Sequence, residues 1–155
     1  MSFRKYGCLS LEQINETEEK IGHKFPSDYK DFLLKTNGGQ FMLLTDEDVH
    51  DFYVDPIDEE NICIDSFYGV GEDACNYLVI FNQEYGDEAE GTIIIGGTLS
   101  HGFIIYDYLG VLEEEGGIYF WDDTRAYKTS SDEGNVYFVA NNFNELLKMC
   151  NLELD

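Results

Sequence analysis

The spacing of apolar residues changes at Asn37-Gly38-Gly39, and this change limits the possible folds more than any other feature of the chain. Ahead of this turn, apolar residues recur every three or seven positions, as on one face of a helix. After it, short runs rich in β-branched and aromatic residues are separated by Gly, Asp and Asn, as in strands joined by turns. The sequence therefore predicts helices first and a sheet second.

Two helices are predicted ahead of the turn. The first begins with the capping-box pattern Ser10-Leu11-Glu12-Gln13 and ends at Gly22. The second begins at Pro26 or Ser27 and ends at Asn37. The apolar residues that mark the two buried faces are Leu11, Ile14, Ile21, Tyr29, Phe32 and Leu33.

Two features of this region have alternative interpretations. Glu18 lies four positions after Ile14, so it either accepts hydrogen bonds from the backbone near the Asn37 turn or lies on a solvated helix face. Asn37-Gly38-Gly39 is typical of a helix end that needs positive φ. A phosphate-binding role is disfavoured, because no cationic residue follows the glycines.

The later apolar runs predict one antiparallel sheet, since no helical pattern separates them as a βαβ arrangement would require. These runs are residues 41–44, 77–81, 92–95, 103–108, 118–121 and 136–140. A loop over residues 45–73 holds at most a short strand near residues 61–64. Asn142 then caps a last helix whose apolar face includes Phe143 and Leu146. We predict an α+β fold with two N-terminal helices, a central antiparallel sheet and a C-terminal helix packed on the sheet.

The charge of the chain restricts its partners. Nine Lys and Arg against 32 Asp and Glu give a net charge of −23 and a pI near 4.1. Nucleic acid and anionic membranes are disfavoured as partners, because both are bound through clustered cations. A basic protein would be attracted by this charge. Solubility alone is the alternative explanation.

The cysteines and the N-terminal residues indicate a cytoplasmic protein. The four cysteines are dispersed, and no two have the CxxC spacing of a metal or redox site, so we expect reduced thiols. Residues 1–7 contain cations, but the apolar stretch of a signal peptide does not follow them. No run has the length of a membrane span.

No catalytic or metal-binding pattern is evident. His23, His50 and His101 are in no context typical of a cysteine nucleophile, and neither a P-loop nor an HExxH motif is present. The acidic residues between 46 and 60 could supply oxygen ligands for Ca²⁺, but they lack the order of an EF-hand, and a solvated loop is the alternative. We therefore predict a non-enzymatic protein without a cofactor or metal.

The ordered motifs of the chain resemble those of the SUKH superfamily. The N-terminal part of the resemblance is Ile14, Glu18, Ile21-Gly22, Phe25-Pro26, Tyr29, Phe32-Leu33 and Asn37-Gly38-Gly39. The chain departs from the pattern at Ile21 and Phe25, where the family usually has Leu. The family's central strands and closing helix are matched by Ile93-Ile94-Ile95-Gly96, Gly102-Phe103-Ile104-Ile105, residues 117–122, Phe138-Val139-Ala140, Phe143, Glu145, Leu146 and Leu147. The resemblance implies one SUKH-like domain over residues 1–155.

The resemblance also implies a function. SUKH proteins act in bacteria chiefly as immunity proteins that bind and occlude polymorphic toxins, many of which carry basic nuclease domains. We predict that acidic residues and aromatic anchors form the partner-binding surface. The candidates are Asp46, Glu47, Asp48, Asp51, Tyr53, Asp55, Asp58, Glu59, Glu60, Tyr68, Glu84, Tyr85, Asp87, Glu88, Glu90, Glu113, Glu114, Glu115 and Trp121. For Trp121, burial in the core is the alternative.

Two other functions remain open from the sequence. The first is a cytoplasmic adaptor like the yeast cell-wall synthesis regulators of the same superfamily, which would bind a partner other than a toxin. The second is a hydrolase, which would need a cleft with clustered His, carboxylate and Cys side chains. The sequence carries no indication of the oligomeric state.

Overall fold

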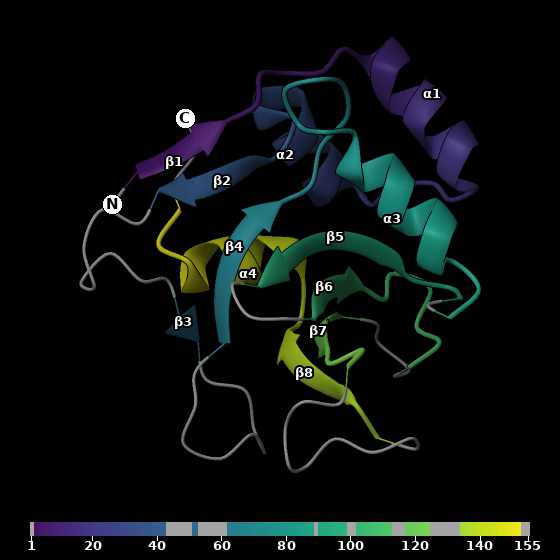
Figure 1. Ribbon diagram of the computed structural model, residues 1–155, viewed down its shortest axis with the longest axis vertical. Coiled ribbons are helices and arrows are strands. Elements are labelled where there is room, and N and C mark those ends of the chain that lie inside the picture. Colours follow the sequence, from purple (N-terminus) through teal and green to yellow (C-terminus); the bar gives the residue numbers. More distant parts are fainter. Residues whose placement is uncertain are drawn as a thin grey trace.

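The computed structural model describes residues 2–42, 51–52, 62–88, 90–98, 102–112, 117–124 and 134–152. The helices are α1 (Leu11–Ile21), α2 (Ser27–Thr36), α3 (Tyr77–Tyr85) and α4 (Phe143–Met149) (Figure 1). The strands are β1 (Ser2–Lys5), β2 (Gly39–Met42), β3 (Asp51–Phe52), β4 (Ile62–Phe67), β5 (Ile93–Thr98), β6 (Phe103–Tyr106), β7 (Ile118–Trp121) and β8 (Val136–Ala140).

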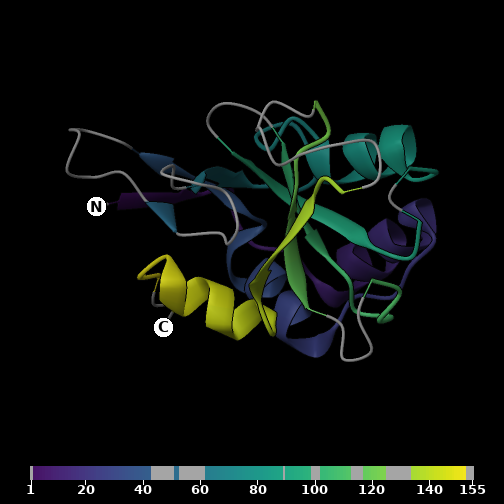
Figure 2. The ribbon, with the colours of Figure 1, turned by 90° about the horizontal axis from the view of Figure 1, so that it is seen from below.

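The strands form an antiparallel sheet in the order β1-β2-β4-β5-β6-β7-β8, with β3 paired to β4. Helices α2 and α4 lie on one face of this sheet and α3 lies on the other, as Figure 2 shows. Helix α1 contacts both α2 and α3. The predicted α+β class, the antiparallel sheet and the packed C-terminal helix are confirmed. No helix in the described ranges has the length and apolar character needed to cross a membrane.

The two N-terminal helices begin and end where the sequence predicts. Ser10 and Gln13 form the capping box, with the Gln13 N–H donating to Ser10 Oγ at 3.1 Å and the Ser10 N–H donating to Gln13 Oε1 at 2.9 Å. Asn37 and Gly38 end α2 with φ of 53° and 76°. A side chain at position 38 is excluded, because a Cβ there would lie 2.5 Å from the Phe67 carbonyl oxygen.

One predicted strand is wrong, because residues 77–81 belong to helix α3. A run of five apolar residues fits either a buried strand or a buried helix segment. The decisive contact is tertiary: the Asn82 amide accepts from the Ile94 N–H and donates to the Ile94 carbonyl, both at 2.8 Å. These two hydrogen bonds connect α3 to β5.

Two other strands differ from the prediction. Strand β1 is not predicted from the sequence, and β4 is longer than the short strand expected near residues 61–64.

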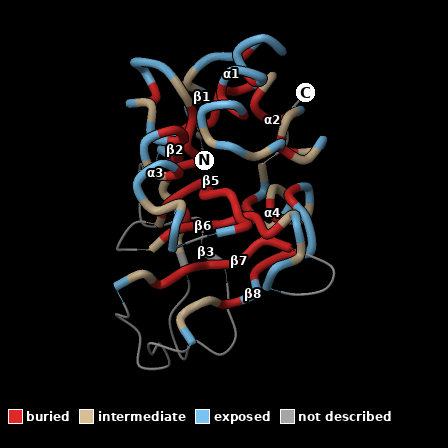
Figure 3. The backbone as a smooth tube through the Cα atoms, turned by 90° about the vertical axis from the view of Figure 1, so that its right-hand side faces the viewer, coloured by how far each residue is buried: buried red, intermediate tan, exposed pale blue. Residues whose placement is uncertain are grey.

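The buried hydrophobic residues form one cluster that joins the sheet to the helices. Figure 3 marks the buried residues in red along the backbone, with long stretches in β5, β6 and β7. The aromatic centre of the cluster lies where α2, α4 and β4 meet. The ring of Phe143 lies 4.9 Å from that of Phe32 and 5.6 Å from that of Phe67 between centroids, and both pairs pack edge to face. Edge-to-face packing is a favoured geometry for aromatic pairs. These rings join the two helices of this face to the sheet.

Glu18 is buried, so the solvated-face interpretation is wrong. Its Oε2 atom accepts from the Phe25 N–H at 2.6 Å and lies 3.4 Å from Lys30 Nζ. The expected position of its partner is also corrected, because the hydrogen bond goes to the connection between α1 and α2 and not to the Asn37 turn. A buried carboxylate needs such partners to offset its desolvation.

Asp28, in the first turn of α2, joins three elements of the fold. Its carboxylate accepts from the Tyr29 N–H at 2.8 Å, from the Tyr106 hydroxyl at 3.2 Å and from the Phe143 N–H at 3.1 Å. Tyr106 belongs to β6, and Phe143 begins α4. Burial, and then the Asp28 charge, raise the pKa of Tyr106 to about 12, so its hydroxyl stays a donor at neutral pH.

Asp28→Ala should lower the free energy of unfolding by about 2–3 kcal/mol, because it leaves a helix N–H and a partly buried hydroxyl without their acceptor. Asp31→Ala is the matched control, since Asp31 is exposed on the same helix. It should change stability by less than about 0.5 kcal/mol. Urea unfolding followed by circular dichroism measures both. Equal midpoints for the two variants would show that the Asp28 contacts do not stabilise the fold.

The structure has all four cysteines as thiols, none of them in a disulfide, and they differ in exposure. Cys8 and Cys75 are exposed, Cys63 is half-buried and Cys150 is buried. Burial, with a smaller effect from Cys63, raises the pKa of the Cys150 thiol to about 12.

Thiol reactivity should follow this order of exposure, because the thiolate is the reactive form and must be reached by the reagent. At pH 8 the folded protein should react quickly with an aromatic disulfide reagent at Cys8 and Cys75, while Cys150 should react only on unfolding. The variant Cys8→Ser/Cys75→Ser should lose the fast phase. Denatured, unreduced protein should titrate four thiols, and a lower number would show that a disulfide is present.

Candidate protein-binding surface

Helix α3 has one side on the sheet and another that bears aromatic rings. Leu78 and Asn82 are buried toward the sheet. Tyr77, Phe81 and Tyr85 are spaced by four and therefore share another side of the helix. We call these three residues the aromatic stripe. Ring centroids are 5.0 Å apart between Tyr77 and Phe81 and 6.2 Å apart between Phe81 and Tyr85. Tyr77 is 41% exposed, and the other two are half-buried.

The aromatic stripe lies on buried aromatic residues of the sheet. The ring of Phe81 is 4.9 Å from that of Tyr68 and 5.3 Å from that of Phe103. The ring of Tyr85 is 5.4 Å from that of Phe103 and 6.3 Å from that of Trp121. Tyr68 and Trp121 are buried. They therefore support the stripe from below and have little surface of their own to offer a partner.

Carboxylates lie near the Tyr85 end of the aromatic stripe and near the buried Tyr68. We call Asp65, Glu84, Glu88 and Asp123 the carboxylate rim. The Glu84 charge is the first cause of the raised pKa of Tyr85, followed by burial, Asp123 and Glu88. Burial, and then Asp65, raise the pKa of Tyr68. The hydroxyls therefore remain neutral donors in a negative potential.

The structure describes the side chains of seven residues that the sequence predicts for the partner-binding surface. Most of these seven lie close together. Tyr68, Tyr85 and Trp121 share one aromatic cluster. Of the three, only Tyr85 is partly exposed, so Tyr68 and Trp121 are not surface anchors in the free protein, and the core alternative for Trp121 is correct. The described acidic candidates are all exposed: Glu84 and Glu88 belong to the carboxylate rim, while Asp87 and Glu90 lie in and near the turn that follows α3.

The other candidates are not placed. Asp51 lies in β3, where only its backbone is described. The remaining candidates lie outside the described residues, and they are Asp46, Glu47, Asp48, Tyr53, Asp55, Asp58, Glu59, Glu60, Glu113, Glu114 and Glu115. The sequence analysis did not include Tyr77 and Phe81 in the surface. It predicted a strand over residues 77–81, and a spacing of four marks a shared side only in a helix. That spacing, continued to Tyr85, was the signal that could have found them.

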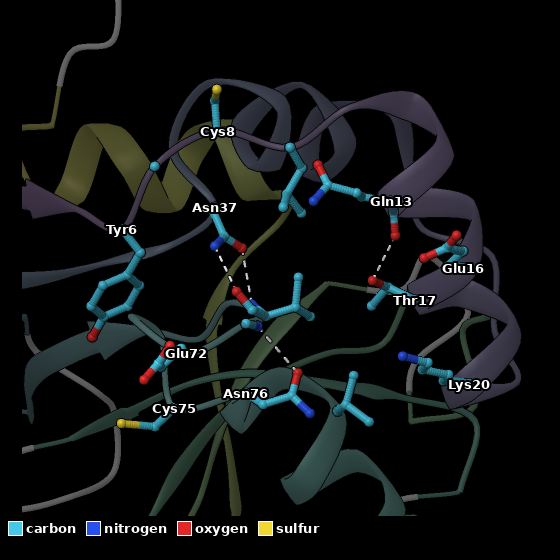
Figure 4. Close-up of a pocket in the computed structure, with 15 residues that line it drawn as sticks. Tyr6, Cys8, Gln13, Glu16, Thr17, Lys20, Asn37, Glu72, Cys75 and Asn76 are labelled. Atoms are coloured by element: carbon cyan, nitrogen blue, oxygen red, sulfur yellow. Dashed lines mark hydrogen bonds between the residues drawn. The ribbon is translucent and has the colours of Figure 1, made fainter.

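A cleft of about 710 Å³ lies on another side of α3 (Figure 4). It is bounded by the β1–α1 connection, by α1 and by the segment that leads into α3. The Asn37 amide lies within it, donating to the Val70 carbonyl at 2.7 Å and accepting from the Val70 N–H at 2.9 Å. This amide is therefore engaged in holding the fold. In the part of the chain that the structure describes, no three His, Cys, Asp or Glu side chains gather as a metal site would require.

Together, the fold and this surface define an α+β protein that carries an aromatic stripe with carboxylates near it. The sequence model of the SMI1/KNR4 family (SUKH-1) matches residues 8–149, and the chain belongs to this family. The chain is also similar to the SPbeta prophage-derived uncharacterized protein YokK of Bacillus subtilis (strain 168). The two are 30% identical over 148 residues, which cover 88% of this chain and 71% of the relative. The family resemblance seen in the sequence is confirmed.

The electrostatic effect of the carboxylate rim can be measured directly. Glu84→Gln should lower the pKa of Tyr85, because Glu84 is the first cause of its increase. Glu19→Gln on α1 removes the same charge at another exposed position and should leave that pKa unchanged. NMR titration of ¹³C-labelled tyrosine follows the Tyr85 resonance. An unchanged pKa in the Glu84 variant would contradict the proximity of the two groups.

Proposed function

We propose that this protein is a non-enzymatic immunity protein that binds a basic toxin domain in the bacterial cytoplasm and occludes it. The observation that carries the proposal is the half-exposed aromatic stripe bordered by the carboxylate rim, in a chain of the SUKH-1 family. Immunity is the function that the family resemblance implies. Occlusion requires a complementary surface and no reaction.

The two parts of the surface would contribute differently to binding. Aromatic side chains, tyrosine above all, are common anchors at interfaces because they bury a large area and keep a polar group for hydrogen bonding. Tyr77 and Tyr85 meet this description. The surrounding carboxylates would steer a cationic partner and set its orientation. Their effect is reinforced by the net charge of −23.

The chemistry of a nuclease toxin fits this surface. A domain that binds nucleic acid carries Lys and Arg where it holds phosphates. The carboxylate rim would occupy those cations in place of phosphates, while the aromatic stripe fills an apolar part of the substrate groove. Such a complex would prevent the substrate from entering.

The charge part of the proposal is tested by association kinetics with a basic toxin domain, taken from the neighbouring genes where they encode one. Glu84→Gln/Glu88→Gln should slow association and flatten its dependence on salt, because exposed charges act mainly on encounter. Glu19→Gln/Asp31→Asn is the matched control, since it removes the same charge from exposed positions on α1 and α2. Equal association rates for both double variants at low salt would show that the carboxylate rim does not steer the partner.

The aromatic part is tested by dissociation. Tyr77→Ala and Tyr85→Ala should each speed dissociation by about tenfold, the effect of losing roughly 1.4 kcal/mol at an anchor. Phe138→Ala is the control, because Phe138 is an aromatic residue of similar exposure on β8, outside the stripe. If no neighbouring toxin domain binds the wild-type protein, the adaptor function takes precedence.

A further inference from the structure

The connection between β6 and β7 exposes three aliphatic side chains within four residues. Leu109 is 58% exposed, Val111 57% and Leu112 43%. We call these three residues the apolar knob. Single exposed apolar side chains are common on proteins, but a contiguous group is typical of an interaction site.

The backbone of the apolar knob is held in one conformation by Asp107. This residue is fully buried, and its two carboxylate oxygens accept from the Val111 N–H and the Leu112 N–H, both at 2.8 Å. Its carbonyl accepts from the Gly110 N–H at 3.2 Å. Charge-assisted hydrogen bonds of this kind are stronger than neutral ones. The knob is therefore ordered before any partner arrives.

The neighbouring residue Tyr108 attaches the same connection to the helices. Its hydroxyl lies 3.0 Å from Nδ1 of His23, a residue in the segment between α1 and α2. A loop fixed both at its own turn and at a second element loses little conformational entropy on binding. This is the property expected of a contact that inserts into a partner.

The apolar knob lies beside the acidic segment that follows α3. Gly91 packs so closely against Val111 that a Cβ at position 91 would lie 2.8 Å from Val111 Cγ1. Glu90 precedes this contact and is exposed, as are Asp87 and Glu88. The knob is thus an apolar projection next to a segment rich in carboxylates, and this segment follows the end of the aromatic stripe.

We infer that the apolar knob inserts into an apolar pocket with a cationic border on the basic protein partner. This inference rests on the proposed function and adds a second contact to it. Charge complementarity favours a basic protein over a second copy of this chain as the partner of the knob. A second copy would bring another net charge of −23 against the same carboxylates.

The test compares substitutions of exposed leucines. Leu109→Ser/Leu112→Ser should speed dissociation from the neighbouring toxin domain by about tenfold or more, since it removes two of the three aliphatic side chains of the knob. Leu11→Ser is the control, because Leu11 is 63% exposed on α1. It should leave the dissociation rate essentially unchanged. Thermal unfolding of each variant checks that the fold is intact.

Direct contact is tested with a photoreactive residue. Leu109→p-benzoylphenylalanine should crosslink to the toxin domain on irradiation, and the same residue at position 11 should not. If stripe variants weaken binding while knob variants and crosslinking show no effect, the inference fails and the proposed function stands. If the wild-type protein binds no toxin domain, both fail. A wild-type dimer that the knob variant converts to monomer would identify a self-association surface and overturn the inference.

Discussion

The close contact between the Asn37-Gly38 turn and the segment after β4 is the constraint on which the rest of the structure depends. Gly38 lies against the Phe67 and Tyr68 carbonyls, and the Asn37 amide bonds both the N–H and the carbonyl of Val70. The turn ends α2 and starts β2, so it sets the path from helix to sheet. The segment that it holds leads directly into α3. The position of the aromatic stripe therefore follows from a turn much earlier in the chain.

Charge and packing act in opposite directions in this protein. The net charge is −23, and repulsion among the many carboxylates opposes a compact state. The described core counters this repulsion with aromatic packing and with specific partners for its buried carboxylates. Glu18 has the Phe25 N–H and Lys30, and Asp107 has two backbone N–H groups. The carboxylates of the rim lie nearer the surface, where a cationic partner can reach them.

The proposed binding surface combines features that would be weak separately. The aromatic stripe offers area, the carboxylate rim offers attraction for cations, and the apolar knob offers a preformed projection. All three lie around α3 and the residues that follow it. Rigid support beneath the stripe, from Tyr68, Phe103 and Trp121, limits the entropy lost on binding.

The sequence by itself determined the ends of the first two helices, the antiparallel class, the family and the acidic character that favours a basic partner. The helix ends follow from local signals, namely a capping box at Ser10 and a positive-φ turn at Asn37. Local signals do not decide the structure of residues 77–81, because a run of five apolar residues is compatible with a strand and with a helix. Only the tertiary structure decided that they form α3, through the pairing of Asn82 with Ile94, and only the helix placed the three rings of the aromatic stripe on one side. The physical reason is that a contact between distant residues depends on the path of everything between them, which no local pattern encodes.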